Sequence, residues 1–264
     1  MTRLLIRLLS HLSIPLLQPF FETIFFFSLV GMNKASTGAA NSSGEKNVLT
    51  FLKQENIFAN KPIIFDVGAH TGQNIEQVIN VFPSAKIVAF EPSKTSFAVL
   101  QKKYKRNKEV QLVMKGLSSK KQTHKLFANK AGSGLASLYE RDLSHTDLTF
   151  SHSEKIVLTT LDSFCAEYMI EKIDFLRMDI EGHELMALQG AKKMLAKRSI
   201  KAIQFEFGGT NIDSRTYFKD FFQLLNENYQ IYRILHNGFW PIKEYKEIHE
   251  IFYNTNFLAV MRDK

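Results

Sequence analysis

The sequence predicts an α/β fold with a mostly parallel sheet that is covered by helices on both faces. Short apolar runs fit for buried strands alternate with segments whose apolar residues recur at helical spacing. The first run, Ile63–Val67, passes through a turn that contains Gly68 and Gly72 into a helical pattern that Pro83 ends. α/β proteins build nucleotide sites from a strand, a glycine-containing turn and a helix in this order.

Composition places the chain among ordinary globular proteins. Of its 264 residues, 45% are hydrophobic and 23% are charged. A single cysteine, Cys165, excludes disulfides within the chain and cysteine-cluster metal sites. The net charge of +8 is concentrated in residues 102–130, where ten lysines and arginines stand against one acid. Because aromatic residues are not interleaved with these cations as a nucleic-acid platform would need, we interpret this segment as a solvated face and expect no nucleic-acid partner.

Residues 1–31 form an apolar N-terminal segment. Arg3 and Arg7 precede an uncharged run over residues 8–21 that two prolines interrupt, so the run is short and broken for a spanning helix. The basic residues and the leucine-rich run would suit a signal peptide, but no convincing small-residue cleavage site follows Leu17. Three readings stay open: a membrane-surface or signal-anchor segment, a helix packed on the body, or a true start of translation at Met32. We expect a cytoplasmic protein, with membrane association through this segment under the first reading.

A linker and one domain are expected after this segment. Residues 32–47 lack apolar periodicity and are predicted to form the linker. The organised domain is predicted over residues 48–264, beginning with a short helix that carries Val48, Leu49 and Leu52.

The domain is expected to contain seven main strands. The last two lie close together in the sequence without a clear helix between them, which predicts an antiparallel last strand. The strands are expected at 63–67, 85–90, 110–114, 173–180, 200–207, 231–235 and 257–261. Helical faces are expected within 75–82, 97–104, 161–168, 185–195 and 218–225, and hairpin strands at 125–128 and 155–159.

Acidic residues stand at the ends of several predicted strands. Asp66, Glu91 and Asp179 are three such acids, with Glu206 as a fourth. Ligands of open α/β sheets bind beyond the carboxyl ends of the strands. An acid after the second strand is well placed to accept hydrogen bonds from both ribose hydroxyls, and we favour this role for Glu91 over a capping or solvated one.

The glycine turn also discriminates between cofactors. A dinucleotide fingerprint needs Gly-x-Gly-x-x-Gly, whereas the spacing here is Asp-x-Gly-x-x-x-Gly with His70 inside the turn. The narrower backbone access favours an adenosine cofactor without a pyrophosphate, S-adenosylmethionine. Asp66 is then expected to orient the turn and the methionine amino end. His70 is either a packed structural residue or a contact to cofactor or substrate.

These motifs in combination resemble the FkbM-type methyltransferases, over about residues 48–264. The resemblance rests on residues 66–72 (Asp-Val-Gly-Ala-His-Thr-Gly), Glu91-Pro92, residues 161–164 (Leu-Asp-Ser-Phe) and residues 173–184 (Ile-Asp-Phe-Leu-Arg-Met-Asp-Ile-Glu-Gly-His-Glu). It implies the Rossmann-like class I methyltransferase fold and S-adenosylmethionine as cofactor. Members of this family typically methylate hydroxyl groups of sugars or secondary metabolites.

The resemblance also implies which residues hold the cofactor. Leu117 lies in a short motif after the third strand, which the family places near the adenine. The chain departs from the family pattern at Arg177, where lysine is common. The residues expected to bind the cofactor are Asp66, Gly68, Ala69, His70, Thr71, Gly72, Glu91, Leu117 and Asp179.

The segment after the fourth strand offers candidate catalytic groups. O-methylation calls for a base that accepts the hydroxyl proton, and Asp179, Glu181 and His183 are the candidates. Strand alternation places Asp179 and Glu181 on one side. The sequence does not rank the three, and a purely structural role as helix cap and packing residue stands beside the catalytic one. We assign no metal ligands.

We therefore expect a methyltransferase that moves a methyl group from S-adenosylmethionine to a hydroxyl of a sugar, glycan or secondary metabolite. The acceptor, a small molecule or carbohydrate, is expected to contact residues 116–159 and the C-terminal strands. Two alternatives stay open: an NAD-dependent oxidoreductase, and a non-catalytic, membrane-associated binding protein of the same fold. The sequence does not predict an oligomeric state.

Overall fold

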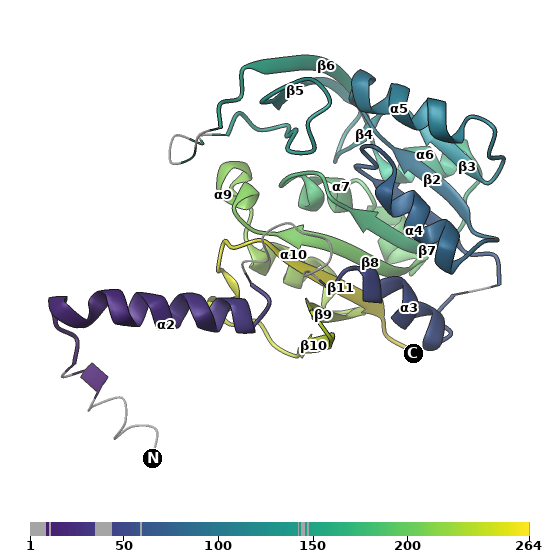
Figure 1. Ribbon diagram of the computed structural model, residues 1–264. Coiled ribbons are helices and arrows are strands. Elements are labelled where there is room, and N and C mark those ends of the chain that lie inside the picture. Colours follow the sequence, from purple (N-terminus) through teal and green to yellow (C-terminus); the bar gives the residue numbers. More distant parts are fainter. Residues whose placement is uncertain are drawn as a thin grey trace.

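The main sheet has eight strands in the order β10-β9-β11-β8-β7-β1-β2-β3 (Figure 1). The computed structural model describes residues 9–10, 12–34, 44–58, 60–141, 143, 146 and 148–263. The strands are β1 (Ile63–Val67), β2 (Lys86–Phe90), β3 (Val110–Val113), β7 (Ile173–Met178), β8 (Ile200–Phe207), β9 (Tyr229–Leu235), β10 (Gly238–Ile242) and β11 (Thr255–Met261).

The strand directions confirm the predicted fold class. β3, β2, β1, β7 and β8 are parallel neighbours. The last strand, β11, runs antiparallel between β8 and β9, as predicted from the missing helix before it. The seven expected strands are all present. β10 is an eighth, which the prediction omitted, and it forms a hairpin with β9.

Helices cover both faces of the sheet because side chains alternate along the strands. In β1, Ile64 belongs to one apolar core and Phe65 to the other. The core of Ile64 includes side chains of α3 (Lys46–Gln54), α4 (Gln73–Val81) and α5 (Lys94–Tyr104). The core of Phe65 includes side chains of α6 (Leu161–Glu167), α7 (Glu184–Gln189), α8 (Lys192–Ala196) and α10 (Phe218–Leu225).

One predicted helix is divided in the structure. The periodicity predicts a single helix over residues 185–195, but α7 ends at Gln189 and α8 begins at Lys192. The Asp162 carboxylate accepts hydrogen bonds from the backbone amides of Lys193 (2.8 Å) and Met194 (3.0 Å), which gives α8 its own N-terminus. The prediction was wrong here because that capping carboxylate comes from a distant segment.

A small second sheet adjoins the main one. It contains β4 (Gly116–Leu117), β5 (Gln122–Ala128) and β6 (His152–Thr159) in the order β4-β6-β5. β5 and β6 pair antiparallel, which confirms the predicted hairpin. Figure 1 shows this sheet above α7 and α9 (Thr210–Ser214). Its apolar side chains form a separate small core of Leu126, Leu138, Ile156 and Leu158.

The N-terminal segment contains η1 (Pro15–Leu17) and α2 (Gln18–Gly31), and Figure 1 shows α2 projecting from the body. A second short turn, η2 (Glu247–His249), precedes β11. Among the described helices, none is long and apolar enough to cross a membrane. Residues 1–8, 11 and 35–43 lie outside the described residues. The proposed division into segment, linker and domain, and the choice among the three readings of residues 1–31, therefore stay predictions.

Candidate functional site

The turn after β1 is packed between the end of β2 and the segment that follows β7. The backbone amides of Gly68 and Ala69 both donate to the carbonyl of Phe90 at the end of β2, each at 3.0 Å. Gly68 has φ +85°, and a Cβ atom there would overlap the backbone carbonyl oxygen of Asp179. This position therefore requires glycine for its conformation and for the close approach of the segment after β7.

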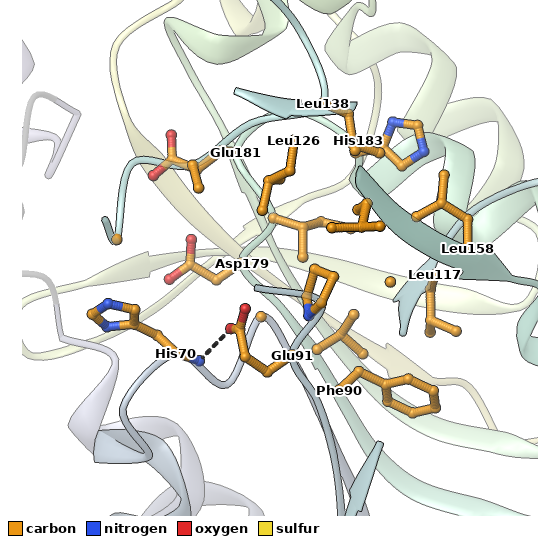
Figure 2. Close-up of a pocket in the computed structure, with 18 of the residues that line it drawn as sticks. His70, Phe90, Glu91, Leu117, Leu126, Leu138, Leu158, Asp179, Glu181 and His183 are labelled. Atoms are coloured by element: carbon orange, nitrogen blue, oxygen red, sulfur yellow. Dashed lines mark hydrogen bonds between the residues drawn. The ribbon is translucent and has the colours of Figure 1, made fainter. Parts of the chain in front are cut away.

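Glu91 fixes this turn through its carboxylate. One oxygen accepts a hydrogen bond from the backbone amide of His70 at 2.8 Å (Figure 2). The other accepts one from the backbone amide of Ser93, also at 2.8 Å. Burial raises the pKa of Glu91, an effect that these two backbone hydrogen bonds oppose. Because a carboxylate oxygen has two lone pairs, each oxygen keeps capacity for a further donor. The Glu91 side chain lines the main pocket, so a ligand hydroxyl has access to it.

Asp66 lies behind the turn and pairs with Arg177. The two residues are register partners on β1 and β7, and Arg177 Nη1 lies 3.3 Å from Asp66 Oδ1. Burial raises the pKa of Asp66, and the positive charge of Arg177 opposes that rise. The same guanidinium contacts Asp179 Oδ2 at 2.7 Å. Arg177 thus forms ion pairs with both Asp66, within β1, and Asp179, which follows β7 and lines the pocket.

The main pocket lies at the carboxyl ends of β1, β2 and β7 and has an empty volume of about 610 Å³. Its walls are of two kinds (Figure 2). Figure 2 shows the polar residues His70, Glu91, Asp179 and Glu181 on one side, and His183 on the other side with Leu138 and Leu158. The apolar wall contains Phe90, Pro92, Leu117, Leu126, Leu138, Ile156 and Leu158. The small sheet therefore supplies much of the apolar side.

The residues predicted to form the site fall into three positions. Gly68, His70, Glu91, Leu117, Asp179, Glu181 and His183 line the main pocket. Ala69 and Thr71 line an adjoining pocket that shares Gly68, His70 and Asp179 with the main one. Gly72 precedes α4 as its N-cap, and Asp66 lines a smaller pocket beside Arg177. The predicted set is thus contiguous, with Asp66, Ala69, Thr71 and Gly72 outside the main pocket.

Glu181 is a partly buried acid that forms an ion pair with Arg141. Its backbone is left-handed, with φ +53°, and its Oε2 lies 3.2 Å from Arg141 Nη1. Arg141 also lies 3.4 Å from Asp213. Burial, with the negative charge of Asp179, raises the pKa of Glu181 to about 8, although Arg141 lowers it. Glu181 therefore exchanges its proton near neutral pH.

His183 has both ring nitrogens engaged. Nδ1 lies 2.8 Å from the Tyr139 hydroxyl, and Nε2 lies 3.0 Å from Ser118 Oγ. Burial lowers the pKa of His183 to about 4. The imidazole is therefore neutral at pH 7, with one nitrogen donating and the other accepting.

The loop between β5 and β6 supplies site residues that sequence reasoning missed. Tyr139 and Arg141 come from this loop, and Ser137 Oγ donates to the carbonyl of Glu181 at 2.8 Å. His70 Nε2 lies 3.0 Å from the carbonyl oxygen of Gly132 in the same loop. These residues follow no apolar periodicity and no spaced motif, so the sequence carries no signal that would have found them.

The buried acids of the site should make stability depend on pH. Burial raises the pKa of Glu181 to about 8 and that of Glu184 to about 7, so the folded protein binds protons that the unfolded chain releases. Their contribution is complete below the unfolded pKa of about 4.3 and is lost as pH rises through the folded values. Since the lowered pKa of His183 offsets part of this loss, we expect the free energy of unfolding to fall by roughly 4 kcal/mol between about pH 5 and 8.

Urea unfolding across this range measures the effect. Glu181→Gln is the matched variant, because it removes one titrating group and should flatten the decline. A free energy of unfolding that rises steadily from the lower to the higher pH would contradict the assignment of these pKa values.

Comparison with known proteins gives one family. The methyltransferase FkbM domain matches residues 66–234, well over half of the chain. The methyltransferase sdnD of Sordaria araneosa is 32% identical over 155 residues, which cover 49% of this chain and 60% of that protein. The chain therefore spans about three-fifths of the length of this curated relative.

Two solved structures align with more than three quarters of this chain. The FkbM methyltransferase of Methylobacillus flagellatus aligns with a TM-score of 0.48 and 18% identity, over 76% of this chain and 44% of that one. A protein of Streptococcus mutans that is described as a methyltransferase and was solved in complex with SAH aligns with a TM-score of 0.45 and 12% identity, over 81% and 95% of the two chains.

Proposed function

Because the chain belongs to the FkbM methyltransferase family, we propose that it transfers a methyl group from S-adenosylmethionine to a hydroxyl of a sugar, glycan or secondary metabolite. The observation that carries this proposal is the position of Glu181. Its carboxyl lines the same pocket as the Gly68 turn and Glu91, and its pKa is raised to about 8. The pocket thus joins a cofactor turn to a base that works near neutral pH.

The residues present fit S-adenosylmethionine. The apolar wall around Leu117 and Leu158 suits the flat adenine ring, and Glu91 keeps lone pairs for the ribose hydroxyls. Gly68 leaves the turn without a side chain where the chain passes Asp179. Asp179 and the backbone of residues 68–71 would hold the methionine end. When bound, the cofactor supplies a methyl group made electrophilic by the sulfonium charge.

Asp179 and Glu181 are suited to different tasks. Asp179 Oδ2 is paired with Arg177 Nη2 at 2.7 Å, so its carboxyl group is held in place beside the turn. Glu181 lies beside Arg141, and burial raises its affinity for a proton. We therefore assign Asp179 to binding of the cofactor and Glu181 to proton transfer. This separation of two neighbouring acids by environment is a common basis for acid–base catalysis.

Glu181 would act as the acceptor oxygen forms its bond to the methyl carbon. The hydroxyl proton would pass to a Glu181 carboxylate oxygen. Arg141 and the Ser137 hydroxyl hold Glu181 in place, the first at the carboxylate and the second at the backbone carbonyl. The apolar wall excludes water, which aids positioning of the acceptor.

His183 serves as a positioning residue in this scheme. Its neutral ring connects Tyr139 of the loop after β5 with Ser118, which follows β4. A group with a pKa of about 4 and two engaged nitrogens is a poor base at pH 7. The ring instead fixes the loop that carries Arg141 and closes the acceptor side of the pocket.

Tyr139→Phe should weaken acceptor binding with little effect on the cofactor. The substitution removes the 2.8 Å hydrogen bond to His183 and keeps the ring, so the loop loses one contact. One hydrogen bond is worth about 1 kcal/mol, so we expect the KM of the acceptor to rise roughly fivefold. Steady-state kinetics and calorimetry with S-adenosylhomocysteine measure the two effects.

Tyr253→Phe is the matched control, because Tyr253 is 44% exposed and does not line the main pocket. An unchanged acceptor KM in Tyr139→Phe together with weaker cofactor binding would contradict the assigned position of this loop.

Methyl transfer to a panel of acceptors tests the proposed function. Purified protein is incubated with S-adenosylmethionine and with glycosides, oligosaccharides and hydroxylated secondary metabolites. The products are located by mass spectrometry and NMR. We expect a methyl ether on at least one hydroxyl acceptor. Methyl groups found only on nitrogen, carbon or sulfur would refute O-methylation while leaving the cofactor assignment in place.

A further inference from the structure

The helix α2 exposes large apolar side chains on every side. Four consecutive residues, Ile24, Phe25, Phe26 and Phe27, are 46%, 52%, 48% and 66% exposed. Successive residues of an α-helix are about 100° apart, so four in a row face most directions around the axis. Phe20 and Val30 extend the apolar surface toward the two ends. Such a helix lacks the polar face that a surface helix of a globular protein has.

The helix is nevertheless fixed to the body at its C-terminal end. Leu29 and Lys34 are buried. The Asn33 side chain donates to the carbonyl of Ile234 at 3.0 Å, and Lys34 Nζ donates to the carbonyl of Ile248 at 3.2 Å. α2 therefore projects from the body at a fixed attachment (Figure 1). The apolar side chains on the N-terminal side of Leu29 remain exposed.

The uncharged polar side chains of α2 donate hydrogen bonds to backbone carbonyls four residues earlier in the chain. Thr23 Oγ1 donates to the carbonyl of Pro19 at 2.7 Å, and Ser28 Oγ donates to that of Ile24 at 2.9 Å. Gln18 Nε2 donates to the carbonyl of Ile14 at 3.3 Å. Hydrocarbon tolerates polar groups only where the protein itself satisfies them. These bonds therefore suit a helix that is surrounded by lipid.

We propose that α2 inserts into one leaflet of an anionic lipid bilayer and holds the domain at the membrane surface. A helix of 14 residues is about 21 Å long, which is shorter than the roughly 30 Å hydrocarbon core, so it enters the bilayer without spanning it. Glu22 is the single charged residue of the helix.

Two features favour lipid over a second copy of the chain. Helix pairing buries one stripe and leaves the opposite side in water, whereas lipid covers every side of α2. The chain carries a net charge of +8, and Arg3 and Arg7 precede the helix in the sequence, which suits negatively charged headgroups.

Vesicle flotation with the full chain tests the proposal. The vesicles are phosphatidylcholine alone, or phosphatidylcholine with phosphatidylglycerol. We expect the protein to float with the anionic vesicles and much less with the neutral ones. The variant Phe25→Ser/Phe26→Ser/Phe27→Ser should lower the partition coefficient by roughly tenfold for each side chain.

Val157→Ser/Met169→Ser is the matched control, because both side chains are exposed, at 51% and 87%, and lie outside α2. It should float like the unchanged protein. Thermal unfolding of all variants should be unchanged, since every substituted side chain is exposed.

Two results would overturn the proposal. The triple variant could float as well as the unchanged protein. Alternatively, the unchanged protein could form a dimer without vesicles that the triple variant dissociates, with no flotation in either case, which would assign α2 to a second copy. Neither readout depends on methyl transfer, so failure of this proposal is distinct from failure of the proposed function.

Depth of insertion provides a second readout. Trp240 is the single tryptophan, so Trp240→Phe removes the background fluorescence and Phe26→Trp places a probe on α2. We expect brominated acyl chains to quench this probe. Flotation without quenching would show adsorption to headgroups and would refute insertion.

Discussion

Gly68→Ala is expected to abolish cofactor binding, with a loss of more than about 100-fold in affinity for S-adenosylhomocysteine. A Cβ atom at this position would overlap the backbone carbonyl oxygen of Asp179, and φ +85° is strained for any residue with a side chain. The turn must shift, and the shift separates the amides of residues 68–69 from the Phe90 carbonyl. The cofactor turn and the Asp179 segment would then no longer fit together.

Isothermal titration calorimetry with S-adenosylhomocysteine measures this loss. Gly209→Ala is the matched control, because its Cβ would meet no atom closer than 3.8 Å and should leave binding unchanged. Circular dichroism separates lost binding from lost folding. A Gly68→Ala protein that is folded and binds within a few-fold of the unchanged chain would contradict the assigned role of the turn.

Glu181→Gln is expected to lower kcat by about 10²-fold or more while binding of S-adenosylhomocysteine changes little. Glutamine keeps the shape of the side chain and a hydrogen-bonding oxygen for Arg141, but it cannot accept the hydroxyl proton. The sulfonium is itself reactive, so we expect the lower end of the range that general bases contribute.

The proposed role of Glu181 also predicts the direction in which kcat/KM changes with pH. The base must be ionised, and burial raises the pKa of Glu181 to about 8, so kcat/KM should rise with pH and level off near that value. The rise should be absent in Glu181→Gln. Glu171→Gln, an exposed acid outside the pocket, is the control that should keep both rate and profile. A Glu181→Gln kcat within threefold of the unchanged protein would assign proton removal to water or to the acceptor itself.

The fold was largely predictable because hydrophobic periodicity determines it. The parallel strands are buried on both faces and therefore appear as apolar runs, such as Ile63–Val67. Glu91 was also predictable, since its place after β2 follows from strand order. β10 was missed because Gly238–Ile242 contains a proline and lies partly exposed at the sheet edge.

The acceptor side of the site was not predictable for a different reason. Tyr139 and Arg141 lie in a loop whose course is determined by long-range contacts to His183, Glu181 and Asp213. Such long-range contacts do not produce a repeating pattern of apolar residues that could be recognised in the sequence. Ranking Asp179, Glu181 and His183 likewise needed the structure, because burial and charge partners decide which of them can move a proton.

Calorimetry of the full chain with S-adenosylhomocysteine and with NAD tests whether the turn at Gly68 binds S-adenosylmethionine. We expect binding of S-adenosylhomocysteine at one site per chain, weakened strongly by Gly68→Ala and unaffected by Gly209→Ala, with no heat from NAD. Tight binding of NAD with no response to S-adenosylhomocysteine would contradict this expectation.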